Sequence, residues 1–144
     1  MKKLLLLTAI LLSAASAVIA SVGMYSNEYV NHLKNCTIHL EKYNAEIPTA
    51  DENTPVLHLT STEAIAGWKE GKCITNSTVF SKDMNKDILK TQCSFNEKQL
   101  DTVVKKITAA NKADAKEKQA LQDELTKYVQ DNALCNVTNL LENE

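Results

Sequence analysis

Four cysteines constrain the fold of this 144-residue chain more than any other feature of its sequence. They are widely spaced, at Cys36, Cys73, Cys93 and Cys135. An even number of cysteines at such spacings is typical of two disulfides in an exported protein. No two of them have the Cys-x-x-Cys spacing, so the sequence supports neither a thioredoxin-like redox motif nor a zinc ribbon.

The N-terminal stretch MKKLLLLTAILLSAASAVIA has the three parts of a secretory signal peptide. Two lysines form a short positive head typical of bacteria, and an apolar run follows that is too short to span a membrane. Small residues then lead to a cleavage position after Ala20, with cleavage after Ala17 as the alternative. The sequence therefore predicts a signal peptide at 1–20 and a mature, periplasmic or secreted chain at 21–144 without a membrane span.

The predicted mature chain has the size of a single domain. It contains 14 lysines against 18 acidic residues, a formal charge of −4, and the whole chain has no arginine. Arginine is the residue best suited to bidentate contacts with phosphate. An acidic chain without arginine argues against a nucleic-acid partner.

The segment around the first cysteine predicts a short helix and then a strand. Ser26 is a favourable helix N-cap, and one apolar stripe repeats every four residues at Tyr25, Tyr29 and Leu33. The next stretch, CTIHLEKY, alternates like a strand. The polar run NAEIPTADENTP contains both prolines, so we expect a loop or an extended crossing there.

The stretch GWKEGKCITNST holds the chain's one tryptophan and predicts the turn of a β-hairpin. A type I turn at Lys69 and Glu70, followed by Gly71 in the left-handed conformation, would give a three-residue loop. Trp68 would then lie opposite Lys72. One face of the hairpin would carry Leu59, Ile65, Cys73 and Val79, and the other Ala64, Ala66, Trp68, Ile74 and Phe80.

A second turn, SKDMNKD, leads into a third predicted strand, ILKTQCSF. Cys93 in this strand falls on the same face as Cys73, which permits a disulfide between them. Cys36 would then pair with Cys135 by elimination. Four cysteines allow three pairings, and the other two stay open.

The periodicity changes from two to nearly four at Asn96. Asn96 and Gln99 have the spacing of a capping box, and Asp114 predicts the start of a second helix. One long bent helix over 97–131 is the alternative to two helices. The final residues, LLENE, predict a frayed tail.

These elements together predict an α+β fold. We expect a short N-terminal helix, an antiparallel meander of three or four strands, and two C-terminal helices on one face of the sheet, with two disulfides. No motif is specific enough to name a family.

The sequence predicts no metal site and no cofactor. The DMNKD stretch has the alternating acidic spacing of a calcium loop, but Ile88 stands where the sharp-turn glycine belongs and Ser94 where the bidentate glutamate belongs. The three histidines lack the short spacing of a metal-ligand pair. They are His32, His39 and His58.

No catalytic residue is predicted either, because the chain has no Gly-x-Ser-x-Gly motif. Its three glycines and two prolines also leave few loops from which to build a cleft. One alternative is a small secreted hydrolase whose carboxylates meet only in the folded protein, among Glu63, Glu70, Asp83 and Asp87. Another is a thiol–disulfide protein, which requires one labile and exposed bridge.

The leading hypothesis is a non-enzymatic, exported, disulfide-stabilised module that binds an unknown protein or a cell-surface component. Trp68 has two interpretations. It covers the sheet face, which we expect for an aromatic residue at a strand end, or it stands exposed as a recognition anchor. In the second case Trp68 is the candidate partner contact.

Overall fold

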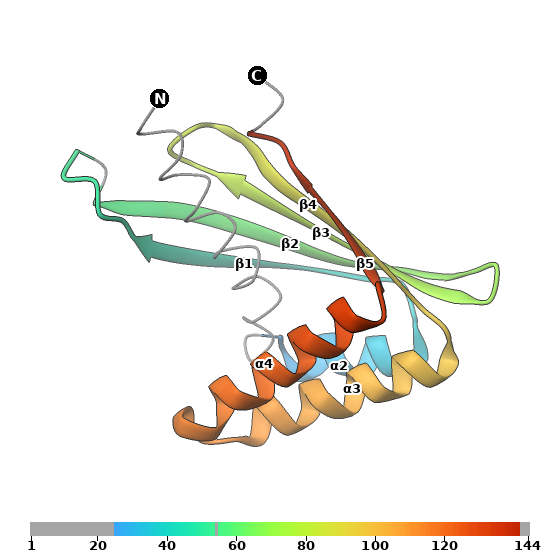
Figure 1. Ribbon diagram of the computed structural model, residues 1–144. Coiled ribbons are helices and arrows are strands. Elements are labelled where there is room, and N and C mark those ends of the chain that lie inside the picture. The colour runs from blue at the N-terminus through green and yellow to red at the C-terminus, as the bar shows by residue number, and fades with distance from the viewer. Residues whose placement is uncertain (1–24, 54, 142–144) are drawn as a thin grey trace.

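A computed structural model describes residues 25–53 and 55–141, so the predicted signal peptide lies outside the described residues. Within these residues the fold is one five-stranded antiparallel sheet of order β1-β2-β3-β4-β5, with three helices (Figure 1). The elements are α2 (Asn27–Asn35), β1 (His39–Pro48), β2 (Val56–Lys69), β3 (Lys72–Ser81), β4 (Lys86–Phe95), α3 (Glu97–Lys112), α4 (Ala115–Asp131) and β5 (Cys135–Asn139). The α+β class is confirmed, but the sheet has more strands than predicted, and α3 and α4 precede its last strand.

The helix boundaries follow from side-chain caps. The Ser26 hydroxyl accepts a hydrogen bond from the Tyr29 amide at 2.9 Å, and Asn96 and Gln99 form the predicted capping box. The Asp114 carboxylate caps α4 by accepting from two backbone amides. The prediction of two helices after the strands is therefore confirmed. None of the helices in the described residues is long and apolar enough to cross a membrane.

The first strand is longer than predicted, because β1 continues through Pro48, into the stretch where a loop was expected. β1 is an edge strand that pairs only with β2. Proline lacks a backbone donor and is tolerated at such an edge. The alternation places His39 and Glu41 on the face that the helices cover, here called the inner face, while Ile38 and Leu40 are exposed.

The β2–β3 hairpin has a two-residue turn instead of the predicted three-residue loop. Glu70 and Gly71 have φ angles of 51° and 77°, and two positive φ values are typical of a type I′ turn. A β-bulge compensates for the shorter turn. Ile65 pairs with Thr75, but Gly67 pairs with Ile74, so Ala66 is the extra residue.

The bulge changes the face on which Trp68 lies. Trp68 pairs with Cys73 and not with Lys72, and directly opposite residues point to the same side of a sheet. The predicted set Leu59, Ile65, Cys73 and Val79 is buried on one face, as expected. The prediction that Trp68 lies on the opposite face from Cys73 is wrong, since one inserted residue reverses the alternation.

The disulfides join Cys36 to Cys73 and Cys93 to Cys135, which corrects the predicted pairing. Cys73 lies opposite Phe95, two residues from Cys93. Cys93 instead lies directly opposite Cys135 of β5, with a Cα–Cα distance of 4.0 Å. The sequence prediction lacked β5 and so lacked the correct partner. The described cysteines leave no free thiol.

The first two residues of the predicted frayed tail, Leu140 and Leu141, are held against the sheet, and 142–144 lie outside the described residues. The Leu140 amide donates to the Ile88 carbonyl at 3.0 Å. Leu141 is buried in a small apolar cluster on the far part of the sheet, together with Leu57, Leu59, Val79, Ile88 and Leu89. A larger cluster fills the space between the sheet and the helices.

Candidate functional site

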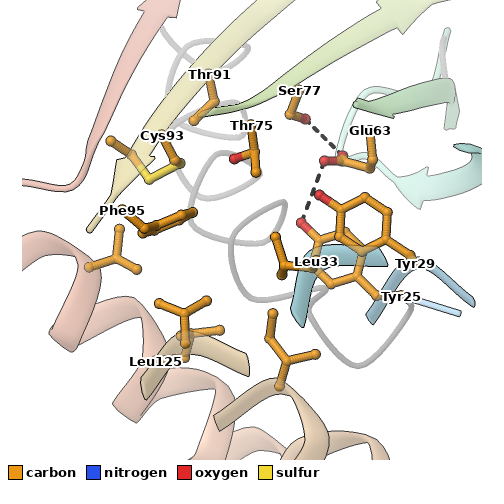
Figure 2. A pocket seen from close by; sticks show the side chains of 14 residues that line it. Tyr25, Tyr29, Leu33, Glu63, Thr75, Ser77, Thr91, Cys93, Phe95 and Leu125 are labelled. Atoms are coloured by element: carbon orange, nitrogen blue, oxygen red, sulfur yellow. Dashed lines mark hydrogen bonds between the residues drawn. A yellow bond between two sulfur atoms is a disulfide. The ribbon is translucent and has the colours of Figure 1, made fainter. Parts of the chain in front are cut away.

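A small cavity lies between the inner face of the sheet and the helices (Figure 2). Its volume is about 70 Å³. Polar side chains from three strands form one wall, at Glu63, Thr75, Ser77 and Thr91. Apolar side chains from α2, α3, α4 and β4 form the rest, among them Leu33, Val103, Ile107, Leu125, Val129 and Phe95.

Glu63 is the charged residue of this wall and is only 5% exposed. Its carboxylate accepts hydrogen bonds from the hydroxyls of Ser61 and of Ser77, the latter at 2.8 Å, and a longer one from Tyr25 at 3.5 Å. Burial raises the pKa of the Glu63 carboxyl, and the three hydrogen bonds offset only part of that effect. The cavity wall therefore favours the neutral acid more than water does.

Two tyrosines cover Glu63 from the side of α2. The rings of Tyr25 and Tyr29 stack with their centroids 4.6 Å apart, and Figure 2 shows both rings beside Glu63. Burial and the nearby Glu63 carboxylate raise the pKa of both phenols, so both stay protonated. This layer closes the cavity toward the N-terminus of α2.

Glu41 lies on β1 directly opposite Glu63 but has the opposite protonation preference. It accepts hydrogen bonds from Ser26, Tyr43 and His39, the last at 2.9 Å. Burial raises the pKa of Glu41, but these donors outweigh it and the net pKa is lowered. Glu41 does not line the cavity, and a volume of about 70 Å³ is far below the roughly 300 Å³ of the smallest typical ligand pockets.

A larger groove, of about 1360 Å³, lies on the outside of the helices between α2 and α3. Trp68 borders it and is 46% exposed. Four apolar residues also contribute to the lining. Val30, Leu100 and Val104 are at most 9% exposed, whereas Ala109 is exposed. The other lining side chains are mainly amides and lysines, with two acidic residues and one threonine: Asn27, Asn31, Asn35, Asn111, Lys34, Lys105, Lys112, Glu97, Asp101 and Thr108.

The two helices run antiparallel along this groove, which fixes its two ends. At one end the Asn111 side chain donates to the Tyr25 carbonyl at 3.2 Å. At the other end the Cys36–Cys73 disulfide follows α2, and Trp68 lies opposite Cys73. Trp68 therefore stands at the end where α2 stops and α3 begins.

The carboxylates proposed for a hydrolase do not gather at one site. Glu63 lies in the middle of β2, and Glu70 lies in the β2–β3 turn. Asp83 and Asp87 lie at the β3–β4 turn, the opposite end of the sheet, and both are exposed. The Asp83 carboxylate there accepts from the His58 amide at 2.7 Å, which lowers the pKa of Asp83.

Both halves of the Cys36–Cys73 disulfide are buried, and Cys93–Cys135 lines the cavity. The fold brings His32 and His39 together and leaves His58 at the far end. The sequence analysis missed Glu41 and the two-tyrosine layer, although Glu41 and Glu63 each occupy an inward position of an alternating strand.

Comparison with family models, curated proteins and solved structures finds no match for this chain.

Proposed function

We propose that this protein is an exported, disulfide-stabilised binding module that holds an extended segment of a partner protein in the groove between α2 and α3. The observation that carries this proposal is the position of Trp68, half exposed at the end of that groove. Tryptophan is enriched among the residues that dominate interface energies, because it buries a large area and donates one hydrogen bond.

The lining of the groove supports a protein ligand. Its apolar lining residues lie among polar side chains, as in interfaces with an apolar core and a polar rim. The four asparagines offer both donors and acceptors, which suits the amides and carbonyls of a peptide backbone. α3 has 16 residues and so extends about 24 Å, the length of roughly seven extended residues.

The charges of the groove favour acidic side chains on the partner. Lys105 pairs with Asp101 at 2.8 Å, whereas Lys34 and Lys112 have no ion-pair partner in the described part of the chain. These two lysines occupy opposite ends of the groove, because α2 and α3 are antiparallel. Complementary charges at a rim speed association and fix the orientation of the ligand.

The two disulfides support export to the periplasm or the medium, since such bonds persist in oxidising compartments. They also fix the groove. Cys36–Cys73 links the end of α2 to the strand beside Trp68. A rigid groove lowers the entropy lost on binding.

Site-specific photo-cross-linking tests the proposal. A photoreactive residue at Asn31, exposed in the groove, should form an adduct with one peptide segment of the native exported fraction, identified by mass spectrometry. The same probe at Leu40, which is 59% exposed but lies outside the groove, is the matched control. Equal adducts from both positions would contradict the proposal.

A synthetic peptide of the cross-linked segment then permits a direct measurement. Trp68 is the one tryptophan, so its fluorescence reports binding without a label. We expect Trp68→Ala to weaken binding by at least about 30-fold, the effect of losing a dominant interface residue, measured by calorimetry. Leu40→Ala should leave the affinity unchanged, and an unchanged affinity for Trp68→Ala would remove Trp68 from the site.

A further inference from the structure

A cluster of possible metal ligands lies where α2 meets β1, outside the linings of both the cavity and the groove. Glu28 and His32 are one helical turn apart on α2, and His39 is the first residue of β1. One ligand atom from each residue lies within 4.8 Å of the others. The two histidines are seven positions apart in the sequence. The chain turns between them, at Cys36, and this turn brings them together.

The hydrogen bonds of the two imidazoles leave one nitrogen of each available as a ligand. His32 Nδ1 lies 2.7 Å from the Thr37 hydroxyl, which itself donates to the His32 carbonyl. Thr37 is therefore an acceptor for an Nδ1 proton, and Nε2 of His32 carries the lone pair. His39 Nε2 lies 2.9 Å from a Glu41 carboxylate oxygen, so Nδ1 of His39 carries the lone pair.

Glu41 has the position of an outer-shell carboxylate. In metal sites the second nitrogen of a ligating histidine typically donates to a carboxylate, which fixes the ring and increases its basicity. His39 is held in this way, and its side chain is only 15% exposed. His39 is therefore an oriented ligand, while Glu28 and His32 lie nearer the surface.

We propose that Glu28, His32 and His39 bind a divalent transition-metal ion such as Zn²⁺, with water in the fourth position. Two imidazoles and one carboxylate are a common ligand set for this class of ion. Tetrahedral coordination with metal–ligand bonds of about 2.1 Å separates the ligand atoms by about 3.4 Å, so the cluster contracts on binding.

The contraction requires one imidazole to turn. The two rings are stacked, with centroids 4.2 Å apart and planes 9° apart, whereas a metal ion lies in the plane of each ring that binds it. His39 is held by the Glu41 carboxylate, whereas the partner of His32 is the uncharged Thr37 hydroxyl, so His32 is the ring that rotates and gives up this contact. Glu28 follows from the preceding turn of α2. The ion would then bind α2 to the edge strand β1, close to the Cys36–Cys73 bridge.

Isothermal titration of the untagged mature protein with Zn²⁺ tests this proposal. We expect one ion per chain, at least tenfold weaker binding for His32→Ala and Glu28→Gln, and 10- to 100-fold weaker binding for Glu41→Gln. His58→Ala, which removes the histidine at the far end of the sheet, is the control and should bind normally.

NMR of the histidine rings gives an independent result if a variant folds poorly. In the unmodified protein Zn²⁺ should shift the signals of His32 and His39 and leave those of His58 in place. No saturable binding, or binding that His58→Ala weakens as much as His32→Ala, would overturn the proposal. Loss of the metal site would leave the proposed peptide groove unaffected, because none of the three ligands lines it.

Discussion

The two ends of the sheet are stabilised in different ways. At one end three helices cover the inner face, both disulfides close, and the larger apolar cluster fills the interior. At the other end, residues 49–53 and the β3–β4 turn stand away from the helices (Figure 1). Among the described residues, the small cluster around Leu59 and Ile88 supports that end. Strands of 10 to 14 residues extend beyond their helical cover, so one sheet contains a cross-linked half and a half held by its own side chains.

Removing a disulfide should lower the free energy of unfolding more than any other change. The faster hydrogen exchange that results should be confined to the helical end. The cysteines are 37 and 42 residues apart, and the chain-entropy model gives about 4 kcal/mol for loops of this size. We expect the free energy of unfolding of the Cys36→Ala/Cys73→Ala variant, measured in urea, to fall by most of this amount. The Cys93→Ala/Cys135→Ala variant is the matched comparison.

Hydrogen exchange of the same variants sharpens the contrast between the two ends. Amides of the helical end should exchange faster, because they open only when the protein unfolds globally. Amides near the β3–β4 turn should keep their rates if that end opens locally. Equal acceleration throughout would mean that the sheet unfolds as one unit and would contradict the comparison.

Glu63 and Glu41, side by side near the boundary of the two halves, should give opposite pH dependences. Folding raises the pKa of Glu63, so its contribution is most favourable below about pH 4.3, the ordinary carboxyl pKa, and declines as the pH rises through the raised value. We expect Glu63→Gln to flatten this decline. Relative to the unmodified protein, the variant should be more stable at neutral pH than in acid, as measured by urea unfolding between pH 3 and pH 8.

Glu41→Gln is the control of opposite sign. Folding lowers the pKa of Glu41, so its contribution is present above the ordinary carboxyl pKa and is lost as the pH falls through the lowered value. This variant should be less stable at neutral pH and should approach the original protein in acid. Parallel pH curves for the two variants would contradict the assignment of their pKa shifts.

The smallest effect should come from Asp83 at the uncovered end. Its carboxylate accepts from both the amide and the ring of His58, but the residue is exposed. Asp83→Ala should accelerate exchange of the His58 amide and leave global unfolding unchanged. Asp87→Ala, which removes an exposed carboxylate of the same turn region, should alter neither measurement. A marked global loss would show that this end is coupled to the rest of the protein.

Local signals in the sequence predicted local structure well. Ser26, Asn96 and Asp114 all cap helices, since a cap depends on residues within one turn. The residues that share the buried face of the hairpin were also grouped correctly, because alternation is a property of the strand itself. The β3 face from Cys73 to Val79 contains no inserted residue to disturb it.

The errors arose where distant residues decide the structure. Alternation alone cannot locate a β-bulge. The bulge at Ala66 puts Trp68 on the face opposite to the predicted one. β5 is only five residues long, and its pairing with β4 determines which cysteine meets Cys93. The histidine cluster depends on how tightly the chain turns after α2, a distance that residue spacing along the chain does not give.

The disulfide pattern has a consequence for how the chain acquires its bonds. Each cysteine pairs with its neighbour in the sequence, the first with the second and the third with the fourth. In a chain that enters an oxidising compartment N-terminus first, Cys73 appears when Cys36 is its one possible partner. Cys93 and Cys135 emerge later, because they lie further along the chain. Oxidation in order of arrival therefore forms the native pairs without reshuffling, whereas the rejected pairing would have required the first cysteine to wait for the last.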